Sequence, residues 1–174
     1  MKKNNYYLIS DRLESIKNLV NKNNIESMLN FKNIDDIKDT ISSEDIRDLL
    51  SKKYIDFSKA INELGGKLSY IKSGSTGHTF QGIHVDENNE PLPDKESYAV
   101  KIVAYPKKEN YGDMYNVKRP ENVEILMIKL LSFFVINKQT PHIVLPISTF
   151  NTSIKPFLSL TKANIVNNKN LNNL

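Results

Sequence analysis

Two glycines at positions 74 and 77 constrain the fold of this chain more than any other feature. Polar and apolar residues alternate on both sides of them, over residues 67–71 and 80–85, as in strands that bury one face. The glycines therefore lie in a tight turn between two strands. A dinucleotide-binding fold or a P-loop would run from a strand directly into a helix, and a P-loop would also need a Gly-Lys-Ser/Thr sequence. The strand pattern after Gly77 argues against both.

A hairpin of this kind can bind phosphate through its backbone N–H groups, where missing side chains let a ligand come close. The same glycines would also fit a purely structural turn. Lys101 lies between Val100 and Ile102 in a β-rich run predicted as a third, central strand over residues 98–105. A lysine in such an apolar setting needs an anion nearby, or a stem that reaches solvent.

A helix is predicted to begin at Pro120, because proline suits the first helical position. An apolar stripe then continues to about Val135, through Ile125, Ile128, Leu130 and Leu131. Glu124 borders this stripe and is the predicted partner of Lys101. Such a pair about 4 Å apart would attract by roughly 4 kcal/mol before desolvation. Glu121 is the competing partner, and either glutamate would also favour the helix N-terminus.

Helical spacing of apolar residues also predicts helices before the hairpin. Two segments are expected within residues 6–30, a third from an N-cap serine at 42–43 to about Lys53, and a fourth over residues 57–64. Gly65 and Gly66 offer the left-handed stop that helix C-termini favour.

Turn residues follow at 86–91, a polar loop at 106–119 and a further strand at 143–150. The predicted fold class is α+β. Residues 1–66 are expected to form an N-terminal helical region, and residues 67–162 an antiparallel β-sheet with one long helix. Residues 163–174 are expected to form an asparagine-rich flexible tail.

Composition excludes several classes of function. Hydrophobic residues make up 39% and charged residues 25%, as in globular proteins. The 24 basic residues are scattered among 20 acidic ones, so no nucleic-acid partner is expected. With no cysteine, disulfides, thiolate metal sites and cysteine nucleophiles are excluded. The absence of cysteine also fits a reducing setting, so we expect an intracellular, cytoplasmic location. The longest apolar run, 125–136, is interrupted by Lys129, so we expect no membrane insertion.

Four segments together resemble the protein kinase family. Residues 71–79 are similar to its glycine-rich loop, 98–102 to its lysine strand, 124–131 to its C-helix, and 142–146 to the segment leading into its fourth strand. Their order and spacing make the resemblance specific, over about residues 67–155, the small lobe of a kinase. The insertion at 106–119 and the asparagine-rich composition are similar to kinases of large DNA viruses, including virion-associated serine/threonine kinases.

The resemblance implies an ATP site. Ile71, Thr79 and Ala99 would wall the adenine pocket, Lys101 would pair with the α and β phosphates, and Glu124 would brace Lys101. The turn would cover the phosphates through Gly74, Ser75, Thr76 and Gly77. Two residues depart from the family pattern: Lys72 replaces the first glycine and Thr79 the usual valine, which implies a stiffer lid and a more polar adenine ceiling.

Phosphoryl transfer also requires magnesium ligands and a base for the substrate hydroxyl. Kinases supply them from His-Arg-Asp and Asp-Phe-Gly motifs, and neither motif occurs in residues 1–174. The histidines, His78, His84 and His142, are expected to be structural or surface residues, with His84 at an exposed strand position. We therefore expect no metal site here, weak ATP binding, magnesium only together with a large lobe, and no catalysis by this polypeptide alone.

Three hypotheses follow. The chain is an N-terminal part of a larger serine/threonine kinase, or a non-catalytic, pseudokinase-like interaction module, or an unrelated α+β binding protein. Expected partners are ATP, a protein that covers the open face of the lobe, the remainder of the kinase, or a second copy of the chain. A virion location is expected if the protein is viral.

Overall fold

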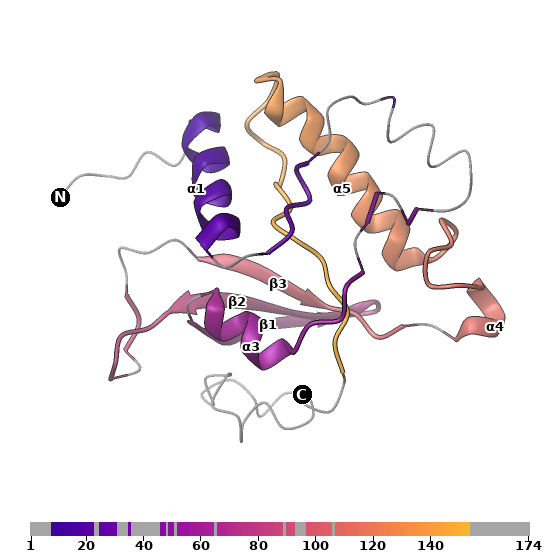
Figure 1. Ribbon diagram of the computed structural model, residues 1–174, viewed down its shortest axis with the longest axis horizontal. Helices are drawn as coiled ribbons and strands as arrows, with labels where there is room; N and C mark the ends of the chain where they lie inside the picture. Colours follow the sequence, from indigo (N-terminus) through magenta and orange to yellow (C-terminus); the bar gives the residue numbers. More distant parts are fainter. Residues whose placement is uncertain are drawn as a thin grey trace. The chain divides into compact units, whose positions relative to one another are not determined.

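The computed structural model describes residues 8–22, 25–30, 35, 46–47, 49–50, 52–64, 66–88, 90–92, 97–105 and 107–153. Its fold is α+β, as predicted (Figure 1). The elements are α1 (Ile9–Lys22), α3 (Phe57–Glu63), β1 (Gly66–Gly74), β2 (Gly77–His84), β3 (Tyr98–Ile102), α4 (Lys108–Tyr111) and α5 (Pro120–Ile136). They fall into two compact units, one of Met1–Lys52 with Pro106–Phe150 and one of Lys53–Tyr105 with Asn151–Leu174. The predicted division at residues 66 and 162 stays a prediction.

The second unit contains an antiparallel sheet in the order β1-β2-β3, which confirms the three successive strands. Among the described residues β2 pairs with both neighbours and β3 lies at the edge of the sheet, so the prediction of a central lysine strand is wrong there. Lys101 is exposed there. The turn at 86–91 is also observed, with the Asp86 carboxylate accepting hydrogen bonds from the N–H groups of Asn88 and Glu90, at 2.8 and 2.9 Å.

Helix α3 covers the sheet unit's core. Asp56 caps its N-terminus by accepting a hydrogen bond from the Lys59 N–H at 2.8 Å. Its buried side chains, Phe57, Ala60 and Ile61, lie on the face that packs against β1. The helix ends at Leu64 in a right-handed conformation, and Gly66 already begins β1. The φ of Gly66 is not positive, so Gly66 is not the predicted left-handed stop, and Gly65 lies outside the described residues.

The first unit is built around α5, which begins at Pro120 as predicted. Helix α1 packs against it. The core cluster consists of Met28, Ile46, Leu50 and Leu126, with Leu49, Tyr115, Val117 and Ile125 packed around it. Within the described part of the chain, no helix is long and apolar enough to cross a membrane.

Two predicted elements of this unit are wrong. Residues 25–30 are not helical and residues 143–150 are not a strand. The Met28 N–H donates to the Ile147 carbonyl at 3.1 Å, and the Ser148 hydroxyl donates to the Glu26 carbonyl at 2.7 Å. These two hydrogen bonds join the segments to each other outside any helix or sheet.

The helix predicted up to Lys53 is not seen among the described residues of that range, 46–47, 49–50 and 52–53. The Leu49 and Leu50 N–H groups both donate to the Ile46 carbonyl at 3.0 Å, which closes a single turn, and residues 52 and 53 are not helical. The predicted N-cap serines at 42–43 and the tail at 163–174 lie outside the described residues.

Candidate functional site

The two glycines of the turn between β1 and β2 have different surroundings. Gly74 and Gly77 pair across the hairpin, with Ser75 and Thr76 between them. Gly77 has φ +159°, and a Cβ there would lie 2.2 Å from the Ile102 carbonyl oxygen, so the packing of β2 on β3 requires glycine. At Gly74 a Cβ would meet nothing within 4 Å, and its φ is not positive. The described fold therefore gives no reason for a glycine at 74.

A β-bulge in β1 changes which side chains share a face of the sheet. Tyr70 pairs with Phe80 and Lys72 pairs with Thr79, so Ile71 is one extra residue. Phe80 is buried, and alternation puts Ile71 on the face opposite to Tyr70 and Phe80. Lys72 lies on that same opposite face, because directly paired residues of antiparallel strands share a face.

The register of β3 adds two more of the predicted residues to this face. Thr79 pairs with Lys101, and Gln81 pairs with Ala99. Ile71, Ala99 and Lys101 are exposed, and Thr79 is half-buried. The structure thus brings together the predicted adenine wall and the predicted phosphate lysine on one open face. What they bind stays a prediction.

On the opposite face of the sheet, three side chains form a short chain of hydrogen bonds. The Ser73 Oγ lies 2.8 Å from the Tyr70 hydroxyl and 2.6 Å from His78 Nδ1. His84, predicted to be exposed, is half-buried and edge-on to the Tyr98 ring at 6.2 Å between centroids. Burial raises the pKa of Tyr98 to about 12. In this face His78 and His84 contact neighbouring side chains, which agrees with a structural role.

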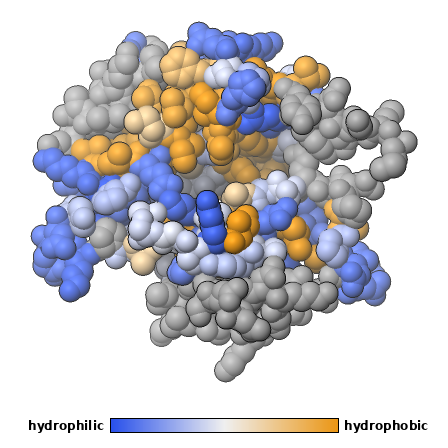
Figure 2. Space-filling model, turned by 180° about the vertical axis from the view of Figure 1, so that it is seen from behind, coloured by the Kyte–Doolittle hydropathy of each residue, from blue (hydrophilic) through white to orange (hydrophobic). Residues whose placement is uncertain are grey.

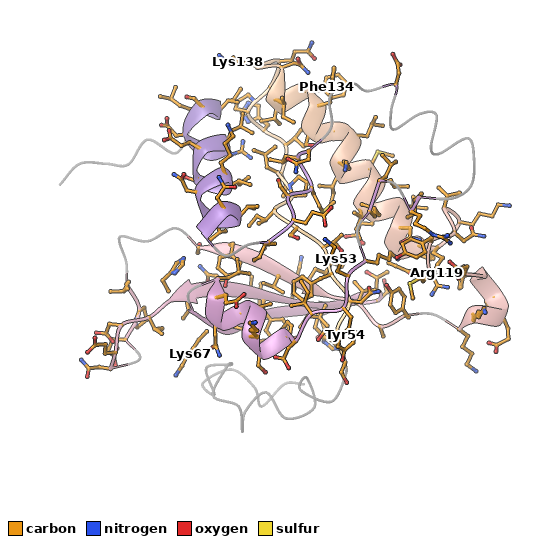
Figure 3. All side chains as sticks on the ribbon, in the orientation of Figure 1. Lys53, Tyr54, Lys67, Arg119, Phe134 and Lys138 are labelled. Carbon is orange, nitrogen blue, oxygen red and sulfur yellow. The ribbon has the colours of Figure 1, made fainter. Side chains whose placement is uncertain are left out.

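Lys101 and Glu124 lie in different compact units, so the ion pair between them stays a prediction. Glu124 is half-buried in the second turn of α5. Glu121, the competing partner, is used within its own unit. Its Oε1 lies 2.6 Å from Arg119 Nε, and both side chains are more than 90% buried. Arg119, at the start of α5 (Figure 3), also donates to the Gly112 carbonyl at 2.8 Å.

Two buried lysines that sequence reasoning missed bind backbone carbonyls in the same unit. Lys52 Nζ donates to Met114 at 2.7 Å and Lys129 Nζ to Leu49 at 3.0 Å. Burial lowers the pKa of Lys52 to about 8; Glu121 and Asp113 oppose the shift, and Arg119 adds to it. Burial likewise lowers the pKa of Lys129, against a smaller opposite effect of Glu26. The apolar run 125–136 around Lys129 could have indicated its burial, whereas no pattern in the sequence marks Lys52 as buried.

No metal site is seen in the described part of the chain, where no group of three His, Cys, Asp or Glu could hold an ion. His142 is exposed, and its N–H donates to the Thr140 hydroxyl at 3.3 Å. It takes no part in the face described above.

No family model and no solved structure matches the chain. The chain is similar to a protein of Acanthamoeba polyphaga mimivirus named "Putative serine/threonine-protein kinase R400", with 47% identity over 110 residues. The match covers 63% of this chain and 22% of the viral protein. The chain thus matches about a fifth of the length of this relative, which carries a kinase name.

Proposed function

We propose that this chain carries the ATP-binding small lobe of a serine/threonine protein kinase of viral type. The observation that carries the proposal is the strand register, which gathers Ile71, Thr79, Ala99 and Lys101 on one exposed face. The glycine turn closes one end of that face. The name of the mimivirus relative supports the reaction class.

Each residue of the face has a part in the proposal. Ile71, Thr79 and Ala99 contact the adenine, and Lys101 binds the α and β phosphates with its ammonium group. The open space at Gly74 lets the phosphates approach the N–H groups of Ser75 and Thr76. A side chain at position 74 would fill that space.

Glu124 orients Lys101 in this proposal, and the rest of a kinase would complete the reaction. Magnesium neutralises phosphate charge in kinases, and we place no magnesium ligand among the described residues. Since neither kinase catalytic motif occurs in residues 1–174, we expect weak ATP binding and no phosphotransfer by this polypeptide alone.

An ATP titration of the full chain tests the proposal. Lys101→Met should weaken ATP binding at least about tenfold, because a charge-assisted contact contributes roughly 1.5–3 kcal/mol. Lys67→Met, which removes a charge from the same face at the far end of β1, should stay within about twofold. Equal affinity of wild type and Lys101→Met would refute the proposed function.

The same titration tests Glu124. If Glu124 orients Lys101, then Glu124→Gln should weaken ATP binding, and the double variant with Lys101→Met should be no weaker than Lys101→Met alone. Additive losses would show that Glu124 acts independently of the lysine.

A second candidate, an interaction module without nucleotide chemistry, is favoured by the surface of α5. Val123, Met127 and Phe134 remain 47%, 51% and 37% exposed on this helix. Figure 2 shows apolar side chains gathered over the part of the molecule that contains α5. Exposed apolar patches often mark interaction sites. Failure of the wild type to bind ATP, with self-association that Met127→Glu abolishes, would favour this candidate.

A further inference from the structure

We propose that Lys72 is a second phosphate contact, which the bulge in β1 turns onto the nucleotide face, so that Lys72 and Lys101 hold the polyphosphate tail between them. This inference rests on the proposed function. It assigns a ligand contact to a residue at which the kinase pattern has glycine.

The bulge decides the direction of Lys72. In an unbroken strand, alternation from Tyr70 would return Lys72 to the buried face. The extra residue, Ile71, shifts the register by one, so Lys72 pairs with Thr79 and shares its open face. Bulges re-aim side chains in this way and are frequent beside binding sites. Both Ile71 and Lys72 therefore reach the same face from consecutive positions.

The charge of the sheet supports an anionic ligand. The three strands contain three lysines, Lys67, Lys72 and Lys101, and no aspartate or glutamate. Lys67 pairs with Ile83, two strand positions beyond Gln81 on β2, so all three lysines lie on the same face.

The spacing of the two lysines indicates a chain of phosphates as the ligand. Lys72 and Lys101 both pair with Thr79, one from each side, so their Cα atoms lie two strand spacings apart, about 10 Å. Their flexible four-carbon stems can converge on a ligand between them. A single phosphate needs one such lysine, whereas a di- or triphosphate can contact both. The open space at Gly74, two residues after Lys72, admits the ligand at the same end of the face.

The test compares ligands that differ in phosphate number, using the full chain. ATP, AMP and inorganic tripolyphosphate are titrated into wild type, Lys72→Gln, Lys72→Arg and Lys101→Met, with Lys67→Gln as the matched control. Urea unfolding checks that each variant folds; Lys72 is exposed, so its replacement should leave the fold intact. Lys72→Gln should weaken ATP and tripolyphosphate binding about three- to tenfold and AMP binding less than twofold, and Lys72→Arg should retain most of the affinity.

The outcomes separate this inference from the proposed function. If Lys101→Met weakens ATP binding while Lys72→Gln does not, the role of Lys72 is overturned and the proposed function stands. Equal losses for Lys72→Gln and Lys67→Gln would indicate only a general effect of charge, and would also overturn it. If wild type binds no ATP, or if neither Lys101→Met nor Lys72→Gln changes its affinity, both proposals fail.

Discussion

The two turn glycines offer a prediction in which stability and binding change in different directions. Alanine at 77 would place its Cβ 2.2 Å from the Ile102 carbonyl oxygen and 3.2 Å from Val103 Cγ2, at a φ of +159°. Strain and displacement of β3 together should cost about 2–4 kcal/mol. Alanine at 74 meets nothing within 4 Å. Because it only restricts the unfolded chain, Gly74→Ala should stabilise the fold by about 0.4–1 kcal/mol.

Binding should respond differently. If phosphates approach the backbone at Gly74, the new methyl group occupies their space, and Gly74→Ala should weaken ATP binding roughly tenfold, about 1.4 kcal/mol. Gly77→Ala should lower both the free energy of unfolding and the affinity, because it moves β3 and with it Lys101. Urea unfolding and ATP titration of the two variants and wild type measure both quantities.

The directions in which stability and ATP affinity change distinguish a phosphate-binding turn from a purely structural one. A purely structural turn predicts that Gly74→Ala binds ATP as wild type does. That result would refute the argument that the open space at Gly74 serves a ligand. A Gly77→Ala variant as stable as wild type would instead contradict the argument that β2 and β3 lie too close together at position 77 to admit a side chain.

Three further predictions concern stability. Arg119→Met leaves the Glu121 carboxylate buried without its cation and should cost about 3–5 kcal/mol in urea unfolding, part of which the double variant with Glu121→Met should recover; additive losses would contradict the pairing. Lys52 has a folded pKa of about 8 against 10.5 unfolded, so unfolding takes up a proton between these values and stability should rise there with pH, by about 1–2 kcal/mol after discounting for nearby solvent. Lys52→Met should flatten this rise, and an unchanged pH profile would contradict it. Asp56→Ala removes the cap on the Lys59 N–H and should cost about 1 kcal/mol by thermal unfolding, while Asp56→Ser should lose little.

Local chemistry explains why the hairpin and the long helix could be predicted from the sequence. The alternation around Gly74 and Gly77 sets a strand, turn and strand within about twenty residues, and Pro120 fixes the start of α5. The apolar spacing over residues 57–64 did the same for α3. Each of these signals lies within the element that it predicts.

The errors arose where the deciding partner is distant in the chain. Residues 25–30 have helical spacing, but Met28 binds the carbonyl of Ile147. The buried lysines depend likewise on distant carbonyls: Lys52 binds Met114 and Lys129 binds Leu49. Neither periodicity nor composition encodes such pairings, because a lysine's hydrogen-bond partner is chosen by the tertiary fold.

The exposed position of Lys101 changes the physical argument for its proposed role in binding phosphate. A lysine buried in a central strand would need an anion to offset desolvation, but Lys101 is exposed on an edge strand and has no such need. Its proposed role in binding phosphate depends instead on the cross-strand row formed by Lys72, Thr79 and Lys101. Only the strand register and the bulge reveal this row. The two lysine ammonium groups repel each other weakly, and an anion bound between them would be attracted to both, which outweighs that repulsion. The proposed binding of phosphate therefore depends on the geometry of this row more than on the burial of one lysine.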